Sequence, residues 1–200
     1  MRRLILVFLF AAMSGCETTS PSVVEFNPRL ETFAVRRVAI IPFESTPVQN
    51  QVEVYFACQR HFVFNNGEVV SDMLTTEMMK LPTFDYVERS QIRKILEEQN
   101  LSMTQFVQQK TASEIGKLLG VDAIIVGKVN RLDADLAFWG FSCVASFSVR
   151  MVDTKTGTVL WSASVERREE HTNVLKVARA QCAKIVAELR EKLTPQSVSK

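Results

Sequence analysis

The chain has 200 residues, a length that accommodates one domain and at most a short tail. Hydrophobic residues make up 46% and charged residues 23%, which is ordinary globular usage and excludes wholesale disorder, a collagen-like chain and a coiled coil. Without Arg2 and Arg3, which lie in a segment that we expect to be removed, the 24 basic residues become 22 and equal the 22 acidic ones. The remaining chain is neutral, so nothing indicates a nucleic-acid surface.

Residues 1–15 have the layout of a secretory signal peptide. Arg2 and Arg3 precede an apolar run at 4–13, which is too short for a spanning helix of about 20 residues. The Met-Ser-Gly-Cys sequence that ends at Cys16 resembles the lipobox of bacterial lipoproteins. The resemblance implies cleavage before Cys16, lipidation of its sulfur and acylation of its new amino group. An ordinary signal peptide with an incidental cysteine is the alternative.

The residue that follows the cysteine, Glu17 rather than Asp, favours the outer membrane by the same resemblance. We therefore expect an outer-membrane lipoprotein whose domain faces the periplasm, held firmly by its lipid chains. Residues 16–34 are polar and contain two prolines, which predicts a flexible tether between the lipid and a folded domain at 35–193. Residues 194–200 are expected to form a loose tail.

The first half of the domain alternates strand and helix patterns. In chain order these are a strand at 35–43, a helix at 67–81, a strand at 83–88, helices at 90–99 and 111–119, and a strand at 122–129. Both longer strands are nearly continuous apolar runs, which is typical of strands buried on two faces. A capping box at Thr111–Glu114 begins the third helix, and Gly120 is well placed to end it in a left-handed conformation.

The second half predicts a strand pair and a final helix. Residues 141–151 alternate apolar and polar side chains, Gly157 lies in a turn, and residues 159–165 form the return strand. Thr172 or Asn173 caps a helix that runs to about Leu193. The resulting order, β-α-β-α-α-β-β-β-α, predicts an α/β fold with helices packed on a mixed five-stranded sheet.

Few residues are arranged for catalysis. His61 and His171 do not have metal-ligand spacing, and we expect them to face solvent or a partner. Asp133 and Asp135 are either an acid/base pair or part of a solvated turn, and the turn is the favoured interpretation. The chain has no glycine-rich phosphate loop and no G-x-S-x-G elbow. The sequence therefore predicts a protein that is not an enzyme and needs no cofactor or metal.

Three cysteines remain after Cys16, and they allow at most one internal disulfide. Cys143 and Cys182 lie on predicted core faces, so we expect both to be small buried apolar residues. A bond from Cys58 to either of them stays open.

The connection at 44–66 is unusually long and contains a strongly aromatic stretch. It is either an extra hairpin packed on the sheet or an exposed partner-binding loop, and both interpretations can hold together. A second apolar segment, 136–141, is expected to form an exposed tip. Because aromatic side chains are favoured anchors of interfaces, the candidate interface residues are Tyr55, Phe56, Phe62, Phe64, Phe138 and Trp139.

Several segments together resemble the CsgG-like family of bacterial lipoproteins, namely Val38–Ser45, Val69–Gln99, Ala112–Val129 and Val152–Ser162. The most specific pieces are Glu88-Arg89-Ser90 and Leu119-Gly120-Val121-Asp122. Similar periplasmic folds are known in LpoB and in the N-terminal domain of TolB. The resemblance covers about residues 35–190 and implies a nonenzymatic outer-membrane lipoprotein with a mixed α/β sheet.

Pore subunits of this family insert two long hairpins that cross the membrane. Here residues 130–140 are expected to form a short connection, and the charged run 166–171 does not suit lipid. We therefore expect a scaffold or accessory lipoprotein of envelope assembly (secretion, surface structures or cell-wall synthesis) that binds envelope proteins and a second copy of itself. The alternative is an oligomeric secretion pore subunit whose membrane strands come from 44–66 and 133–143. The pathway and the physiological partner stay open.

Overall fold

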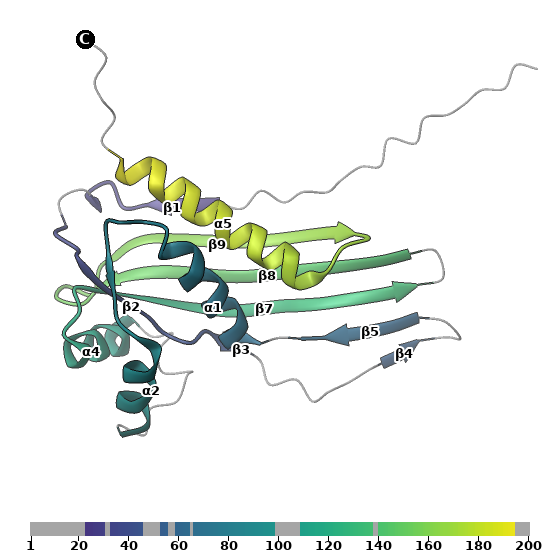
Figure 1. Cartoon of the computed structure of the whole chain (residues 1–200), viewed down its shortest axis with the longest axis horizontal. Helices are drawn as coiled ribbons and strands as arrows, with labels where there is room; N and C mark the ends of the chain where they lie inside the picture. Colours follow the sequence, from purple (N-terminus) through teal and green to yellow (C-terminus); the bar gives the residue numbers. More distant parts are fainter. Residues whose placement is uncertain are drawn as a thin grey trace, which may run out of the picture.

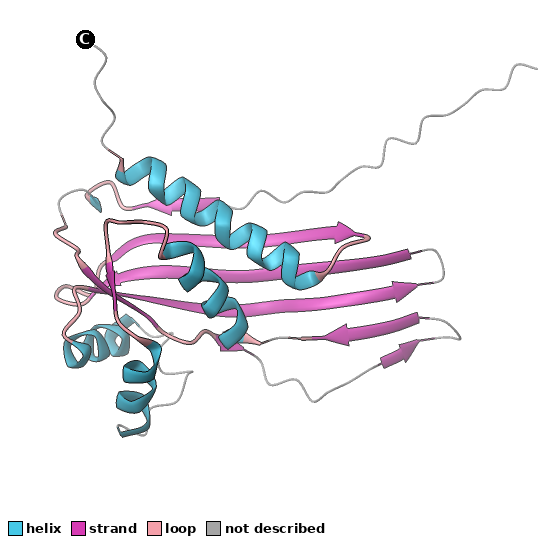
Figure 2. Cartoon of the chain, viewed as in Figure 1, coloured by secondary structure: helices cyan, strands magenta, loops and turns pink. Residues whose placement is uncertain are grey.

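The computed structural model describes residues 23–30, 33–45, 53–55, 59–64, 66–98, 109–137 and 140–194. These residues form one mixed nine-stranded sheet with helices on both faces (Figures 1 and 2). In chain order the elements are β1 (Val23–Phe26), β2 (Arg37–Ile40), β3 (Glu44–Ser45), β4 (Glu53–Tyr55), β5 (Gln59–Val63), α1 (Gly67–Met78), β6 (Asp85–Tyr86), α2 (Arg89–Glu98), α4 (Gln109–Leu119), β7 (Ala123–Ala137), β8 (Gly140–Asp153), β9 (Val159–Glu170) and α5 (Val174–Leu193).

The sheet has the strand order β1-β9-β8-β7-β2-β6, and β3 and β5 also pair with β7. β2 is parallel to β6 and β7, and β3 is parallel to β7. The pairs β7–β8, β8–β9 and β9–β1 are antiparallel. This arrangement follows from the chain order, because helices lie between the early strands while few residues separate β7, β8 and β9 along the sequence.

Two apolar cores lie on opposite faces of the sheet. Helices α1 and α5 cover the larger core, which includes Leu74, Met78, Phe147, Trp161 and Ile185. Helices α2 and α4 cover a smaller core at one end of the other face, formed by residues such as Ile41, Ile92, Ile115 and Ile124. The rest of that second face has no helix over it among the described residues (Figure 1).

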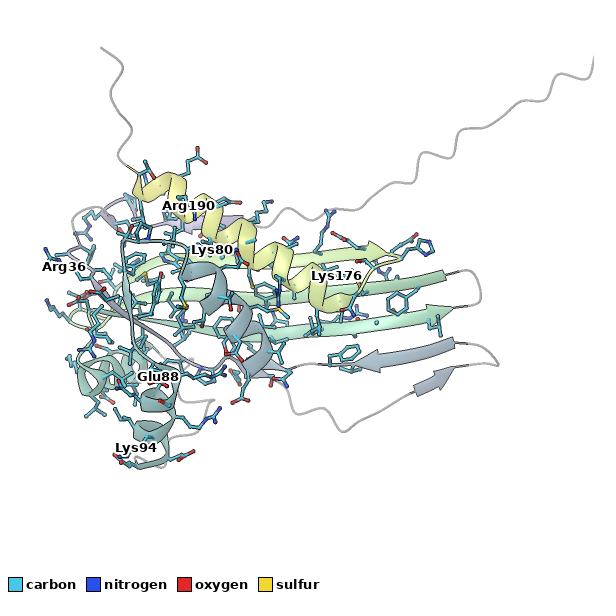
Figure 3. The ribbon with its side chains drawn as sticks, in the orientation of Figure 1. Arg36, Lys80, Glu88, Lys94, Lys176 and Arg190 are labelled. Atoms are coloured by element: carbon cyan, nitrogen blue, oxygen red, sulfur yellow. The ribbon has the colours of Figure 1, made fainter. Side chains whose placement is uncertain are left out.

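The helix ends are fixed by side chains that cap them. The Asn66 side chain accepts a hydrogen bond from the Val69 amide at 3.2 Å, and the Asn173 side chain accepts one from the Leu175 amide at 2.8 Å. Asn173, rather than Thr172, is therefore the cap of α5. Near the other end of α5, the Arg190 guanidinium donates to the Lys80 carbonyl at 3.2 Å and ties this helix to the segment after α1 (Figure 3).

The predicted fold class and the order β-α-β-α-α-β-β-β-α are confirmed by β2, α1, β6, α2, α4, β7, β8, β9 and α5. The sheet is larger than expected, because β1, β3, β4 and β5 add to the five predicted strands. The connection at 44–66 does contain an extra hairpin, but the hairpin extends the sheet rather than packing on it, since β4 pairs with β5 and β5 pairs with β7.

The tether predicted at 16–34 overlaps with the folded part. β1 pairs with β9, with Val24 opposite Ala163 and Phe26 opposite Trp161, and Leu30 is buried. A four-residue edge strand between polar residues has no pattern of its own, because its stability comes from a partner that is distant in sequence. Residues 1–22 and 195–200, with the predicted leader and tail, lie outside the described residues.

The expectation that residues 130–140 form a short connection is wrong. β7 continues to Ala137 and pairs with β8 as far as Gly140, and β9 continues to Glu170 (Figure 2). Asp133 and Asp135 therefore lie in a strand rather than in a solvated turn. Asp133 is only 3% exposed and forms an ion pair with Arg131.

Candidate interaction surface

The two aromatic segments meet at one end of the sheet. Arg60 of β5 lies opposite Leu136 of β7, and Leu136 lies opposite Phe141 of β8. The ends of β4 and β5 and the ends of β7 and β8 are therefore neighbours (Figure 1). We call this part of the molecule, formed by β4, β5, residues 132–145 and the turn before α5, the distal end.

The turn between β9 and α5 also belongs to the distal end. The His171 amide donates to the Phe141 carbonyl at 2.7 Å, and His171 has a left-handed backbone with φ 55°. Its imidazole lies so close to Gly140 that a Cβ there would be 3.1 Å from His171 Cε1. His171 is exposed, as expected for a histidine that faces solvent or a partner.

Three of the six candidate aromatic residues fall within the described residues. Tyr55 ends β4, and Phe62 lies in β5 opposite Ala134. Phe64 follows β5, donates its amide to the Leu132 carbonyl at 2.7 Å and is 47% exposed. The other three, Phe56, Phe138 and Trp139, lie outside the described residues, as does the lipidation candidate Cys16.

The distal end carries exposed apolar side chains beyond the predicted aromatics. Leu136 is 40% exposed and Leu175, in the first turn of α5, is 37% exposed. Leu136 lies in the apolar segment at 136–141 that the sequence analysis singled out. Leu175 lies outside the apolar stripe of its helix, so no sequence pattern marked it as a surface residue. Phe64 thus follows β5 beside Leu132, Leu136 lies near the end of β7, and Leu175 lies in the first turn of α5, so the three exposed side chains come from separate parts of the chain.

Charged side chains occupy the same end of the sheet. On the helix-free face Arg131 pairs with Asp133, and the Arg168 guanidinium lies 3.7 Å from the Asp135 carboxylate. In β9 charges occupy both faces, because residues 166–170 are all Glu or Arg.

Two features from the sequence analysis hold the fold together rather than form a reactive site. Arg89 pairs with Asp72 and lies 3.7 Å from Glu68, which joins α2 to α1. The Asp122 carboxylate accepts hydrogen bonds from the Arg36 and Arg37 amides, each at 3.0 Å, and these bonds lower the pKa of Asp122. The two most specific pieces of the family resemblance therefore connect neighbouring elements.

The two described cysteines, Cys143 and Cys182, do not form a reactive site. Cys143 and Cys182 are free thiols and completely buried, as expected, and Cys58 lies outside the described residues. Burial raises the pKa of Cys182 to about 12, with a smaller contribution from Glu77, and burial also raises the pKa of Cys143. A thiol with a raised pKa is a poor nucleophile at neutral pH.

The described residues show neither a metal cluster nor a membrane helix. No group of three His, Cys, Asp or Glu side chains in them is arranged to hold a metal ion. None of the helices formed by these residues combines the length and the apolar character needed to cross a bilayer.

Comparison with solved structures shows similarity in fold at low sequence identity. Lipoprotein GNA1162 from Neisseria meningitidis is 14% identical and has a TM-score of 0.53, with 76% of this chain and 99% of that chain covered. The PelC dodecamer from Paraburkholderia phytofirmans is 12% identical and has a TM-score of 0.50, with 85% and 96% covered. The C-terminal domain of LpoB from Salmonella enterica is 12% identical and has a TM-score of 0.42, with 66% and 82% covered.

Comparison by sequence identifies the family. No curated protein matches the chain. The family described as curli production assembly/transport component CsgG matches residues 33–140, which is more than half of the chain. This match runs from the segment before β2 to the start of β8 and includes both specific motifs, so the chain belongs to the CsgG family.

Proposed function

We propose that the protein is a nonenzymatic lipoprotein of the bacterial envelope that binds other envelope proteins through its distal end. The family, whose name refers to curli production, assembly and transport, supports a role in envelope assembly. The lipobox at Cys16 supports anchoring in the outer membrane, with the domain in the periplasm. The fold is shared with a protein named as a lipoprotein in Neisseria meningitidis.

The observation that carries this proposal is the meeting of the two aromatic segments at the distal end. Phe64, which lies beside Leu132, and Leu136, four residues farther along β7, are both exposed by 40% or more, and β5 and β7 are paired between them. Exposed apolar groups gathered at one place are typical of interaction sites, whereas single ones are not. Aromatic side chains bury much area at a small cost in entropy, so they suit the centre of such an interface.

A second copy of the chain is one partner that the fold suits. β4 lies at the edge of the sheet and pairs only with β5 among the described strands. Free strand edges accept further strands readily. The solved PelC structure with the same fold is a dodecamer, which supports self-association here.

An oligomeric secretion pore subunit is the alternative. The short connection expected from the sequence at residues 130–140 would argue against a pore. That expectation does not hold, because β7 has 15 residues and β8 has 14. The paired β9, however, has charged residues on both faces from Glu166 to Glu170, and charged side chains in contact with lipid are costly. We therefore favour the accessory role.

The proposed interface is tested by truncating the exposed side chains one at a time. Phe64→Ala and Leu136→Ala should weaken self-association, measured by sedimentation equilibrium, and an interface hot spot would cost about 2 kcal/mol or roughly 30-fold in Kd. Trp139→Ala tests the predicted aromatic residue between β7 and β8 in the same way. Met79→Ala is the matched control, because Met79 is 67% exposed and lies at the end of α1, away from the distal end.

Thermal melts of each variant separate binding from folding, because truncating a buried aromatic would cost about 3–5 kcal/mol of stability. Self-association equal to that of wild type in all three distal variants, with crosslinking of the same envelope proteins in cells, would contradict the proposal. The anchor is tested separately, since Cys16→Ser should abolish palmitate incorporation and release the protein from membranes. Undiminished labelling of that variant would exclude lipidation at Cys16.

A further inference from the structure

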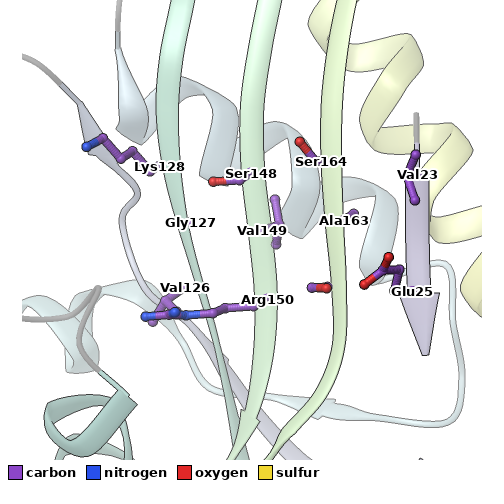
Figure 4. Close-up of a pocket in the computed structure, with 11 residues that line it drawn as sticks. Val23, Glu25, Val126, Gly127, Lys128, Ser148, Val149, Arg150, Ala163 and Ser164 are labelled. Carbon is purple, nitrogen blue, oxygen red and sulfur yellow. The ribbon is translucent and has the colours of Figure 1, made fainter. Parts of the chain in front are cut away.

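The helix-free face of the sheet has a hollow of about 460 Å³ next to the smaller core. It spans β1, β9, β8 and β7 (Figure 4). The hollow exists because three neighbouring positions on the sheet carry the small side chain of serine, namely Ser148, Ser162 and Ser164. Larger side chains surround these serines, so the depression results from the size of the residues rather than from a gap between elements.

The strand register explains how the polar groups line the hollow. Residues that pair across antiparallel strands share a face. Ser148 lies opposite both Lys128 and Ser164, and Arg150 lies opposite both Val126 and Ser162. One row of the hollow is therefore Val23, Ser164, Ser148 and Lys128, and the next row is Glu25, Ser162, Arg150 and Val126.

The cations of the hollow have no protein partner among the described residues. Arg150 Nη2 is buried and makes no hydrogen bond there. Burial lowers the pKa of Arg150, yet a guanidinium stays charged at neutral pH. A buried donor without an acceptor costs free energy that an acceptor from a ligand would recover. The guanidinium of Arg150 thus lacks an acceptor.

We propose that this hollow binds a phosphate group. Arg150 offers a planar fork that suits two phosphate oxygens, Lys128 adds a second positive charge, and the serine hydroxyls are further donors. Two cations match the charge of a phosphate dianion better than that of a carboxylate. The volume lies within the range of about 300–1,000 Å³ that small-molecule sites occupy.

The position of the hollow favours a phosphate that belongs to a lipid head group. Val23 lines the hollow and follows Cys16 by seven residues, which span at most about 25 Å when extended. If Cys16 carries the lipid, as the proposed function requires, the hollow cannot move far from the membrane surface. Lipid phosphates are then the anions most available to it.

Glu25 opposes this binding from one side. It lies on β1, whereas Arg150 lies on β8, with β9 between them (Figure 4). Adjacent strands are about 4.8 Å apart, so the backbones of these two residues are separated by roughly 10 Å. The carboxylate is therefore far enough from the guanidinium to leave it unpaired, and removing this charge should strengthen phosphate binding.

The experiment uses the whole chain in an uncharged detergent and isothermal titration calorimetry at constant ionic strength. The three ligands are inorganic phosphate, short-chain phosphatidic acid and short-chain phosphatidylcholine. We expect phosphatidic acid to bind more tightly than inorganic phosphate, and phosphatidylcholine, whose phosphate is capped by a cation, to bind weakly. Arg150→Gln and Lys128→Gln should each weaken phosphate binding at least tenfold, as expected for lost charge-assisted hydrogen bonds.

Further variants separate specific recognition of the phosphate by Arg150 from a general effect of positive charge on the protein. Arg150→Lys keeps the charge but loses the fork, and should still weaken binding. Glu25→Gln should strengthen it about two- to threefold, the size of a screened charge effect. Lys176→Gln is the matched control, because it removes one exposed positive charge from α5 on the other face (Figure 3) and should change nothing. Circular dichroism melts confirm that each variant is folded.

Each outcome decides a separate question. Equal binding of inorganic phosphate and phosphatidic acid would keep the phosphate site and overturn the lipid source. No binding by wild type, or wild-type affinity in both Arg150 variants, would overturn the site, as would an equal loss in Lys176→Gln. Because the titration does not need a lipid on Cys16, its failure is distinguishable from a failure of the anchor, which palmitate labelling reports.

Discussion

Gly120 ends helix α4 and begins the turn into β7. Its backbone has φ +62°, its amide donates to the Lys117 carbonyl at 3.1 Å, and the Val121 amide donates to the Gly116 carbonyl at 3.0 Å. A Cβ built on Gly120 has no atom within 4 Å. Any cost of a substitution here is therefore a backbone cost, because there is nothing nearby for a side chain to strike.

The magnitude follows from the left-handed conformation. An L residue pays about 1–2 kcal/mol there, and a β-branched residue is the least tolerated. We expect Gly120→Val to cost about 2 kcal/mol and Gly120→Ala about 1 kcal/mol, while Gly120→Asn should cost least, because asparagine visits this region readily. For a domain of this size each kcal/mol lowers Tm by roughly 2–4 °C, so the valine variant should melt roughly 4–8 °C below wild type.

The assay is a thermal melt of the three variants by circular dichroism, with urea denaturation as a second measure of the free energy of unfolding. The ranking Val, Ala, Asn, from most to least destabilised, is the diagnostic result. An unchanged Tm in Gly120→Val would show that the backbone is not left-handed here. Equal losses in Gly120→Asn and Gly120→Val would show that a contact, and not the backbone, sets the cost.

Three other predictions follow from the same region and from the core. Gly116→Ala should destabilise by about 1–3 kcal/mol despite the helix preference of alanine, because its Cβ would lie 2.0 Å from Thr154 Cγ2. Asp122→Asn should lose about 1–2 kcal/mol at pH 7, because two amides at the start of β2 donate to the carboxylate. Since these bonds lower the pKa of Asp122 in the folded state, the stabilisation is present above the ordinary value of about 4 and disappears as pH falls through the lowered one. Cys143 and Cys182 should resist alkylation at pH 8 in the native protein and react fully in urea, because both thiols are buried and have raised pKa values.

Their controls are simple. A Gly116→Ala variant as stable as wild type would mean that the turn after β8 shifts freely. An Asp122→Asn difference that does not shrink toward pH 3 would assign the effect to packing rather than to charge. Rapid alkylation of either thiol without denaturant, located by peptide mapping, would show that the core opens locally.

Much of the fold was predictable from local patterns. The periodicity of α1 and α5, the cap of α5 to within one residue and the left-handed Gly120 are each signalled by residues that are close together in the sequence. The strands β2, β8 and β9 were recognisable because one or both of their faces are apolar. In each case the feature depends on an apolar stripe or a backbone angle that the local sequence specifies, so it can be recognised without knowing the tertiary structure.

The far halves of β7 and β9 were not recognisable in this way. Arg131, Asp133 and Asp135 lie on a part of the sheet that none of the described helices covers, and β9 carries charges on both faces from Glu166 to Glu170. A strand of this kind is held by the hydrogen bonds of its neighbours and by ion pairs, so its sequence resembles that of a loop. β1 was missed for the same reason, since its four residues depend on pairing with β9.

The sequence by itself determined the family, the candidate anchor Cys16 and the aromatic character of two separate segments. Only the tertiary structure decided that these segments are neighbours, because the pairing of Arg60 with Leu136 depends on strand register. The hollow is a tertiary property as well. Its serines come from β8 and β9, its cations from β7 and β8, and its carboxylate from β1, so no stretch of sequence contains it. Side chains on one sheet face are brought together by backbone hydrogen bonds that do not depend on side-chain identity, which is why such a site leaves no local signal.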